Sequence, residues 1–263
     1  MFTGFYSSSA GMLAQMKNMN IIANNIANIS TSGYKKDRGI FRSFYDSAIN
    51  SSPSPLTSNG TILQNRDNNS LPVIERTVTD YENGVTKQTG NVLDVAIAGD
   101  GFFELMGANG ETYFTRQGSF TLNENREMVT ADGLKLMGEL NTIKFPESLD
   151  GSEQASISID ENGHVAIGEE SVGDINIVTF NDNNALKKIG KSLFVNENKA
   201  NESDELFSGR IAQGHIEMSN VNPVEEMTQM ITANRSFEAY QRSLRAIMEE
   251  ATDKSINLIG RVR

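Results

Sequence analysis

The chain has 263 residues, enough for one large domain or two domains of ordinary size. It contains no cysteine, which excludes disulfide bonds, thiolate zinc sites, iron–sulfur clusters and a cysteine nucleophile. The formal charge of −11 argues against nucleic acid as a ligand, because phosphate binding requires a concentration of Lys and Arg.

The first expected element is a helix over about residues 12–29. Its apolar side chains recur in alternating steps of four and three, at Met12, Met16, Met19, Ala23 and Ile26. Three asparagines share the opposite face: Asn24, Asn25 and Asn28. Gly33 supplies a stop, since glycine accepts the left-handed conformation that commonly closes a helix. Residues 1–11 lack the features of a secretory signal, and no run approaches the roughly 18 apolar residues that span a bilayer, so we expect a soluble protein without such a signal.

The interior of the chain changes in character after a polar segment. Residues 46–70 are rich in Ser, Asn and Pro and follow neither the helical nor the strand period, so we expect a long loop or extended connector there. Short alternating runs then predict strands over 112–121, 126–138, 156–159, 164–167 and 175–180. Turn residues at 123–125 and 160–163 separate neighbouring runs. The interior is therefore expected to be mostly β.

A second helix is expected from Pro223 to about residue 259. Asn222 is a good N-cap, proline suits the first helical position, and Glu225 stands three residues after the cap. A seven-residue apolar repeat follows through Met230, Ala233, Phe237, Tyr240, Leu244, Ile247, Ala251 and Leu258. Such a helix is about 55 Å long. Its seam requires either the first helix of the same chain, as an ordinary hairpin, or helices of other chains.

Three segments resemble the axial proteins of the bacterial flagellar hook and basal-body rod. The first is 23–36, which includes Gly33 and Tyr34. The second is 93–103 with 113–120, which includes Gly101, Phe102 and Phe103. The third is 219–227 with 234–238, which includes Asn220, Asn222, Pro223 and Glu225. The last of these segments is closer to the proximal-rod F-type, and the distal-rod G-type is the next choice.

The resemblance implies an α+β fold in which long N- and C-terminal helices form a coiled-coil layer around a mostly β central domain. The implied bounds are 1–33 with 217–263 for the helical domain, 34–90 for an extended connector with short strands, and 91–216 for the β-domain. The implied function is that of a structural subunit of the rod in the periplasm. Such a subunit is exported unfolded and then polymerises into a tube that transmits torque and encloses the export channel. A distal-rod or hook-type subunit is the alternative.

The implied partners are other copies of the chain, proximal and distal rod proteins and, in transit, the flagellar export apparatus. No nucleic acid, small-molecule substrate, metal or cofactor is expected. Residues 41–215 carry 13 basic and 26 acidic side chains, which suits a solvated outer body. A helical seam left unburied in the free monomer would order only when neighbours cover it.

The expected assembly interface takes residues from both helices. They are Met12, Met16, Met19, Asn24, Asn25, Ile26, Asn28, Met227, Met230, Phe237, Tyr240, Leu244 and Ile247. The asparagines could instead form a solvated face, and the apolar residues could be ordinary core. The segment 99–101 is expected to be a turn, since Glu104 stands where a phosphate-binding loop needs a third glycine. We expect no enzyme activity; a peptidoglycan-cleaving enzyme and a free-standing secreted adhesin are the alternatives from other classes.

Overall fold

The computed structural model describes residues 2–45, 70–139, 141–146, 157–168, 170–190, 192–203 and 207–260. The chain divides into two compact units. The helical unit comprises Met1–Ile26, Asp37–Val78 and Pro223–Arg263, and the β unit comprises Ala27–Lys36 and Thr79–Asn222. The expected connector over 34–90 is therefore shared between the units, since residues 37–78 group with the helices. The expected loop at 46–70 lies outside the described residues except for Ser70, the first residue of a strand.

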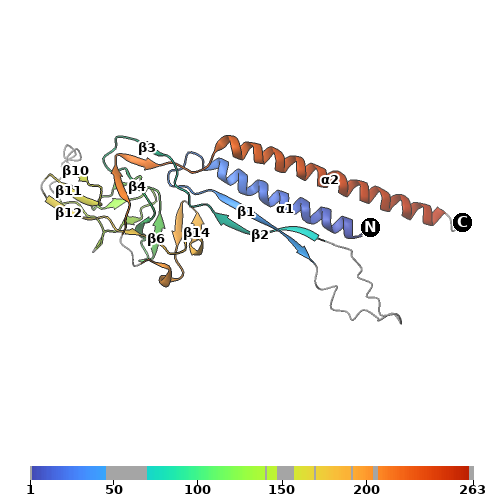
Figure 1. Cartoon of the computed structure of the whole chain (residues 1–263), viewed down its shortest axis with the longest axis horizontal. Helices are drawn as coiled ribbons and strands as arrows, with labels where there is room; N and C mark the ends of the chain where they lie inside the picture. Colours follow the sequence, from blue (N-terminus) through green and yellow to red (C-terminus); the bar gives the residue numbers. More distant parts are fainter. Residues whose placement is uncertain are drawn as a thin grey trace. The chain divides into compact units, whose positions relative to one another are not determined.

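Two helices form most of the helical unit (Figure 1). α1 spans Phe2–Ala27 and α2 spans Pro223–Gly260. The predicted start of α2 is confirmed, whereas α1 begins ten residues earlier than the apolar pattern indicates. Ser and Gly between residues 4 and 11 weaken the local helical preference, and packing against α2 overrides it. No helix in the described part of the chain is long and apolar enough to cross a membrane.

A two-stranded ribbon completes the helical unit. β1 spans Asp37–Tyr45 and β2 spans Ser70–Thr79, and the two strands pair with each other. A Cβ added to Gly39 would lie 3.3 Å from Ile21 Cδ1 of α1 and 3.4 Å from the Cδ1 of buried Ile74. The missing side chain at Gly39 thus allows the ribbon to approach α1 closely.

Short strands make up the β unit, as the alternating patterns predict. In chain order they are β3 (Thr86–Gln88), β4 (Val95–Ala98), β5 (Phe102–Met106), β6 (Thr112–Thr115), β7 (Thr121–Leu122), β8 (Met128–Val129), β9 (Lys135–Leu136), β10 (Ile157–Ile159), β11 (His164–Ile167), β12 (Glu170–Asp174), β13 (Ile177–Val178), β14 (Lys187–Gly190), β15 (Leu193–Val195), β16 (Arg210–Gln213) and β17 (His215–Glu217). Two short 3-10 helices, Asn183–Ala185 and Lys199–Asn201, lie on either side of β14 and β15.

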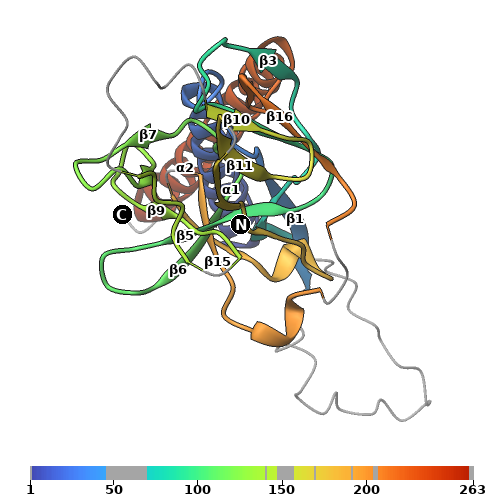
Figure 2. The same ribbon diagram turned by 90° about the vertical axis from the view of Figure 1, so that its left-hand side faces the viewer.

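The largest sheet runs β14-β15-β6-β5-β9-β8-β7, and β13 also pairs with β5. Figure 2 shows β5, β6 and β15 side by side. A separate sheet has the order β10-β11-β12, and two pairs, β16 with β4 and β17 with β3, complete the unit. The strand pairs described in the β unit are antiparallel, so strands that follow each other in the chain, such as β5 and β6 or β10 and β11, can be joined by short loops.

Several predicted strands are shorter in the structure than the sequence pattern suggests. The hairpin at 160–163 is confirmed, because β10 and β11 pair across it. The run 112–121 instead breaks into β6 and β7. Between them Gly118 accepts a hydrogen bond from the Val95 backbone N–H, and any Cβ at Gly118 would lie 1.6 Å from the Val95 carbonyl oxygen. Because Gly118 pairs closely with Val95, the chain after β6 no longer continues the pairing of β6 with β15.

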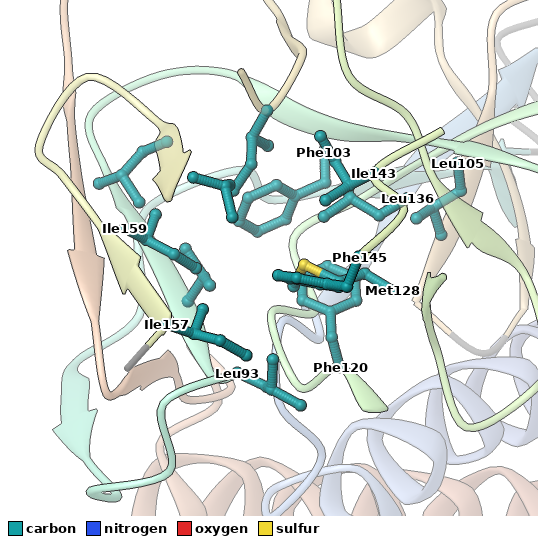
Figure 3. Packing of buried hydrophobic residues seen from close by; sticks show 14 of the residues in the cluster. Leu93, Phe103, Leu105, Phe120, Met128, Leu136, Ile143, Phe145, Ile157 and Ile159 are labelled. Carbon is teal, nitrogen blue, oxygen red and sulfur yellow. The ribbon is translucent and has the colours of Figure 1, made fainter. Parts of the chain in front are cut away.

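The core of the β unit lies on both faces of β5. Phe103 points into the larger apolar cluster, where its ring meets that of Phe120 edge-on at 5.4 Å between centroids (Figure 3). Phe102, next along the strand, belongs to a second cluster with Phe114 and Phe194. Successive strand residues point to opposite faces, so both signature phenylalanines are buried.

Candidate functional site

The helices α1 and α2 are antiparallel and keep a constant register. Gly4 lies by Ile247, Ser8 Oγ is 3.2 Å from Ser243 Oγ, and Gly11 lies against Tyr240. Farther along, Asn25 donates to Glu226 Oε2 at 3.2 Å. Each step forward along α1 in this series is matched by an equal step back along α2. The hairpin between the two helices, one of the two arrangements left open by the sequence, is therefore present within the chain.

The predicted seam of α2 is the least exposed face of that helix. Ala233 is buried, and Met230, Phe237, Tyr240, Leu244, Ile247 and Ala251 are half-buried. Leu258 lies outside the residues whose side chains are described. By the register above, residue 249 lies opposite Phe2, so the last turns of α2 extend past α1.

The buried face of α1 differs from the expected one. The buried positions are Ser8, Gly11, Ala14, Ile22 and Asn25. This face is turned by about one residue from the stripe of larger apolar residues, since one residue corresponds to about 100°. In that stripe Met12, Met19 and Ile26 are half-buried, while Met16 and Ala23 are exposed. Small side chains permit the close approach to α2, and the methionines remain on the flank.

An apolar outer face remains on both helices. Its residues, between 45% and 72% exposed, are Leu13 and Met16 on α1 and Val224, Met227 and Ile231 on α2. Val224, Met227 and Ile231 follow helical spacing, so they form one stripe. Phe5, Tyr6 and Met248 are further exposed large side chains of the two helices. Solvated helix faces normally carry polar residues, so the exposed apolar residues of the two helices (Leu13, Met16, Val224, Met227 and Ile231), hereafter called the outer face, are candidate contact residues.

The three asparagines of the first signature segment occupy different environments. Asn25 is 1% exposed and is bonded to Asp37 and Glu226. Asn28 is half-buried and accepts a hydrogen bond from Thr31 Oγ1. Asn24 is exposed. Asn25 thus acts inside the chain, and Asn24 offers the most accessible side chain of the three.

Within the β unit, a buried charge cluster joins Lys35 of the first signature segment and Arg116 of the second to Glu217 of β17. Glu217 Oε1 accepts hydrogen bonds from Lys35 Nζ at 2.7 Å and from the Gly84 backbone N–H at 2.8 Å. Its other oxygen lies 3.4 Å from Arg116 Nη1. Lys35 also donates to the backbone oxygens of Tyr81 and Glu82. One carboxylate therefore bridges two cations from distant parts of the sequence.

Burial dominates the electrostatics of this charge cluster. The pKa of Lys35 is lowered by desolvation, which the Coulombic attraction and hydrogen bond of Glu217 partly offset. Burial likewise lowers the pKa of Arg116, and the negative charges of Glu217 and Asp100 partly offset this shift. Arg116 also stacks over the Phe102 ring, 5.2 Å from its centroid, and its Nε is buried without a hydrogen-bond partner. This cluster holds the fold together, because such buried charges are costly unless paired.

Gly33 and Tyr34 connect the first signature segment to the cluster. The Gly33 N–H donates to the Glu217 carbonyl oxygen at 2.8 Å. A Cβ at Gly33 would lie 2.3 Å from the Gln117 nitrogen, and its φ is +65°, so the position requires glycine. Tyr34 is buried, with the ammonium of Lys188 4.0 Å from its ring centroid. The sequence pattern did not identify Lys35, Arg116 and Glu217 as a cluster, because the only available signal was one charged residue inside or beside each of the three signature segments.

The remaining signature residues are structural. Asn220 bonds to three backbone groups of the β unit. Pro223 begins α2 directly after Asn222, and Glu225 accepts a hydrogen bond from Gln229 one turn later. Gly101, at φ +138°, follows the bend that joins β4 to β5. A strand follows that bend, whereas a phosphate-binding loop opens a helix.

The described residues offer little for catalysis or metal binding. They contain no group of three or more His, Asp or Glu side chains able to hold a metal ion. His164 is half-buried and paired with Asp174 Oδ1 at 2.7 Å, and His215 bonds to the Gln213 backbone oxygen. The features that stand out in the described residues are thus the exposed apolar side chains of the two helices and the buried polar and charged contacts.

Three family models match the chain. A flagellar basal body rod protein model matches residues 5–35, a flagellar hook protein FlgE/F/G D1 domain matches 96–167, and a flagellar basal body rod FlgEFG protein C-terminal model matches 212–254. These segments contain most of α1, much of the core of the β unit and most of α2.

Relatives match over nearly the whole chain. The flagellar basal-body rod protein FlgG of Borreliella burgdorferi is 34% identical, covering 99% of this chain and 97% of that protein. FlgG of Bacillus subtilis is 32% identical, covering 98% and 99%. The flagellar hook-basal body complex protein FlhO of the same bacterium is 27% identical over 100% of both chains.

Proposed function

The chain belongs to the flagellar basal-body rod family and is a structural subunit of the rod, and on this premise we propose that it polymerises through the outer face of its helices. The expected coiled-coil layer is then built from α1–α2 hairpins of successive subunits. In this arrangement the subunits form a tube that encloses the export channel and transmits torque. Other rod proteins, above and below, are the further partners.

The observation that carries this proposal is the apolar outer face itself. The seam between α1 and α2 accounts for Tyr240, Ile247 and their heptad neighbours, yet Leu13, Met16, Met227 and Ile231 remain in water. Burying a side chain of this size yields about 1.5–3 kcal/mol. Because the face repeats on every copy, neighbouring hairpins can cover one another.

The exposed outer face also couples the folding of the α1–α2 hairpin to assembly. A hairpin with an uncovered apolar face gains less stability from its own contacts than a covered one. We therefore expect the helices to open readily in the free subunit, as passage in an unfolded state through the export apparatus requires. The acidic interior, with 26 acidic against 13 basic side chains over 41–215, keeps the free subunit soluble and faces the periplasm.

We also propose that the chain is a G-type rather than an F-type rod subunit. FlgG of Borreliella burgdorferi and FlgG of Bacillus subtilis are 34% and 32% identical over nearly the whole chain, which supports this choice. The F-type features of the segment 219–227 with 234–238 favour the opposite choice but are confined to that part of the chain, whereas the FlgG likeness extends along 98% of it.

A polymerisation assay tests the proposal. We expect Met227→Ser with Ile231→Ser to raise the concentration needed for sedimentable polymer by about tenfold or more, because two apolar contacts are lost at each interface. Asn234→Ser, an exposed polar change on the same helix, is the matched control. Polymer formation at the wild-type concentration by the double variant would refute the outer face as the interface.

The absence of enzyme activity is part of the proposal. The relatives' names describe rod and hook-basal-body proteins, which supports a structural role. Incubation with purified cell-wall sacculi distinguishes this role from a peptidoglycan-cleaving one. Release of soluble muropeptides, abolished by substituting a single carboxylate, would overturn it.

A further inference from the structure

The two units are joined by few covalent links. Within the described residues, the chain passes between them at four peptide bonds: Ile26–Ala27, Lys36–Asp37, Val78–Thr79 and Asn222–Pro223. The hydrogen bonds to the residues beside these links determine whether local unfolding of one unit also loosens the other.

On the helical side, the Asn25 side chain holds three of the crossing segments. Its Nδ2 donates to the Asp37 carbonyl oxygen at 2.9 Å, and its Oδ1 accepts from the Asp37 N–H at 3.0 Å. Nδ2 also donates to Glu226 Oε2 at 3.2 Å. The amide thus joins the end of α1, the first residue of β1 and the first turn of α2. All these bonds lie inside the helical unit and are shielded from water, since Asn25 is 1% exposed.

On the β side, the Asn220 side chain holds residues near three links, of which Lys36–Asp37 and Asn222–Pro223 are also held by Asn25. Its Oδ1 accepts from the Lys36 N–H at 2.8 Å. Its Nδ2 donates to the carbonyl oxygens of Asp80 at 2.9 Å and Glu82 at 3.1 Å. The Asp80 N–H in turn donates to the Lys36 oxygen at 2.8 Å. These bonds lie inside the β unit and involve the residues beside three of the four links.

We propose that Asn25 and Asn220 form a coupling device that transmits opening of either unit to the other. The clamped residues Lys36 and Asp37 are consecutive, so a single trans peptide, about 3.8 Å between Cα atoms, separates them. Because no flexible residue lies between the clamps, a backbone displacement at Lys36 reaches Asp37. The device goes beyond the proposed function and operates in the isolated subunit.

Hydrogen exchange on the full-length monomer tests the device, with the Asp37 and Met230 amides reporting on the helical unit. Asn220→Ala removes bonds only from the β unit, yet we expect both reporters to exchange about tenfold faster. Asn83→Ala is the matched control, because Asn83 is exposed in the β unit with one bond of 3.4 Å to the Gly99 oxygen. The reciprocal variant Asn25→Ala is expected to accelerate exchange of the Asp80 amide, with Asn234→Ala as its control.

The outcomes separate coupling from local structure. Faster exchange in the unit that does not contain the substitution supports the device. Acceleration confined to the substituted unit overturns it. If Asn220→Ala fails to fold, Asn220→Asp keeps the acceptor for Lys36 and loses only the donor, and the same two outcomes apply. If the wild-type chain fails to polymerise while exchange in the two units remains coupled, that result counts against the proposed function alone.

Discussion

The Lys35 ammonium lies 2.7 Å from Glu217 Oε1, although 182 residues separate the two in the chain. Both side chains are almost fully buried, at 1% and 3% exposure. Arg116 approaches the other oxygen of the same carboxylate. Glu217 therefore neutralises two buried cations at the point where the first signature segment, the segment after β6 and the strand β17 meet in the β unit.

Removing Glu217 should cost more stability than removing Lys35. Glu217→Gln leaves two buried cations with only the weaker attraction of Asp80 and Asp100, and we expect a loss of about 3–5 kcal/mol. Lys35→Met leaves Glu217 paired with Arg116 and frees only two carbonyl oxygens, with an expected loss of about 1–3 kcal/mol. Urea unfolding of the two variants measures the order. Equal losses, or a larger loss for Lys35→Met, would contradict the account of the cluster.

Gly11 should tolerate no large side chain, because a Cβ there would lie 2.5 Å from the Tyr240 ring. Gly11→Leu is expected to separate the hairpin and to lower helical circular dichroism. Gly4→Ala is the matched control, since its Cβ would make an ordinary contact of 3.5 Å with Ile247 Cδ1. Alanine there should stabilise α1 by about 0.5–1 kcal/mol through helix preference. Unchanged helicity in Gly11→Leu would contradict the observed register.

The helices show which parts of the structure the sequence can predict. Proline and the heptad repeat predicted the start of α2 and its buried face, because both are local signals. The same reasoning singled out the larger side chains at Met12 and Met16, which lie beside the face of α1 that packs against α2. Packing favoured Ser8 and Gly11, whose small size is useful only when Tyr240 lies opposite. That relationship spans more than 200 residues and leaves no periodic trace.

Ser192 should be replaceable by glycine without loss. Its φ is +58°, a left-handed conformation that favours glycine, and its hydroxyl is buried without a hydrogen-bond partner. Ser192→Gly removes both the strain and the unsatisfied group, so we expect a gain of about 1 kcal/mol. Thermal unfolding of the β unit measures it. Ser192→Val should destabilise, and a stabilised valine variant would refute the strain.

Acid should destabilise the β unit through Glu127 and Asp160. The pKa of Glu127 is lowered chiefly by the hydrogen bond from Lys135, and that of Asp160 by the backbone N–H of His164. A depressed folded-state pKa gives stability above the ordinary carboxyl value, and this stability is lost as pH falls through the folded value. We expect the free energy of unfolding to decline below about pH 4–5. Glu127→Gln should flatten this decline, and an unchanged slope would contradict the assignment.

The β unit was predicted in class but not in detail. Alternation and turn residues predicted the hairpin at 160–163, whereas Gly118 interrupted a longer predicted strand through a contact with Val95. The charge cluster and the clamps at Asn25 and Asn220 could not be predicted, because each depends on residues brought together by the whole fold. Asn25 illustrates the limit: the helical pattern placed it on a polar face, and the structure buries it against Asp37 and Glu226.

A structure of the assembled rod at side-chain resolution tests the central claim most directly. We expect Leu13, Met16, Met227 and Ile231 to be buried against helices of neighbouring copies, with the α1–α2 hairpin retained inside each subunit. The same side chains facing solvent in the rod, with neighbouring subunits in contact only through their β units, would contradict it.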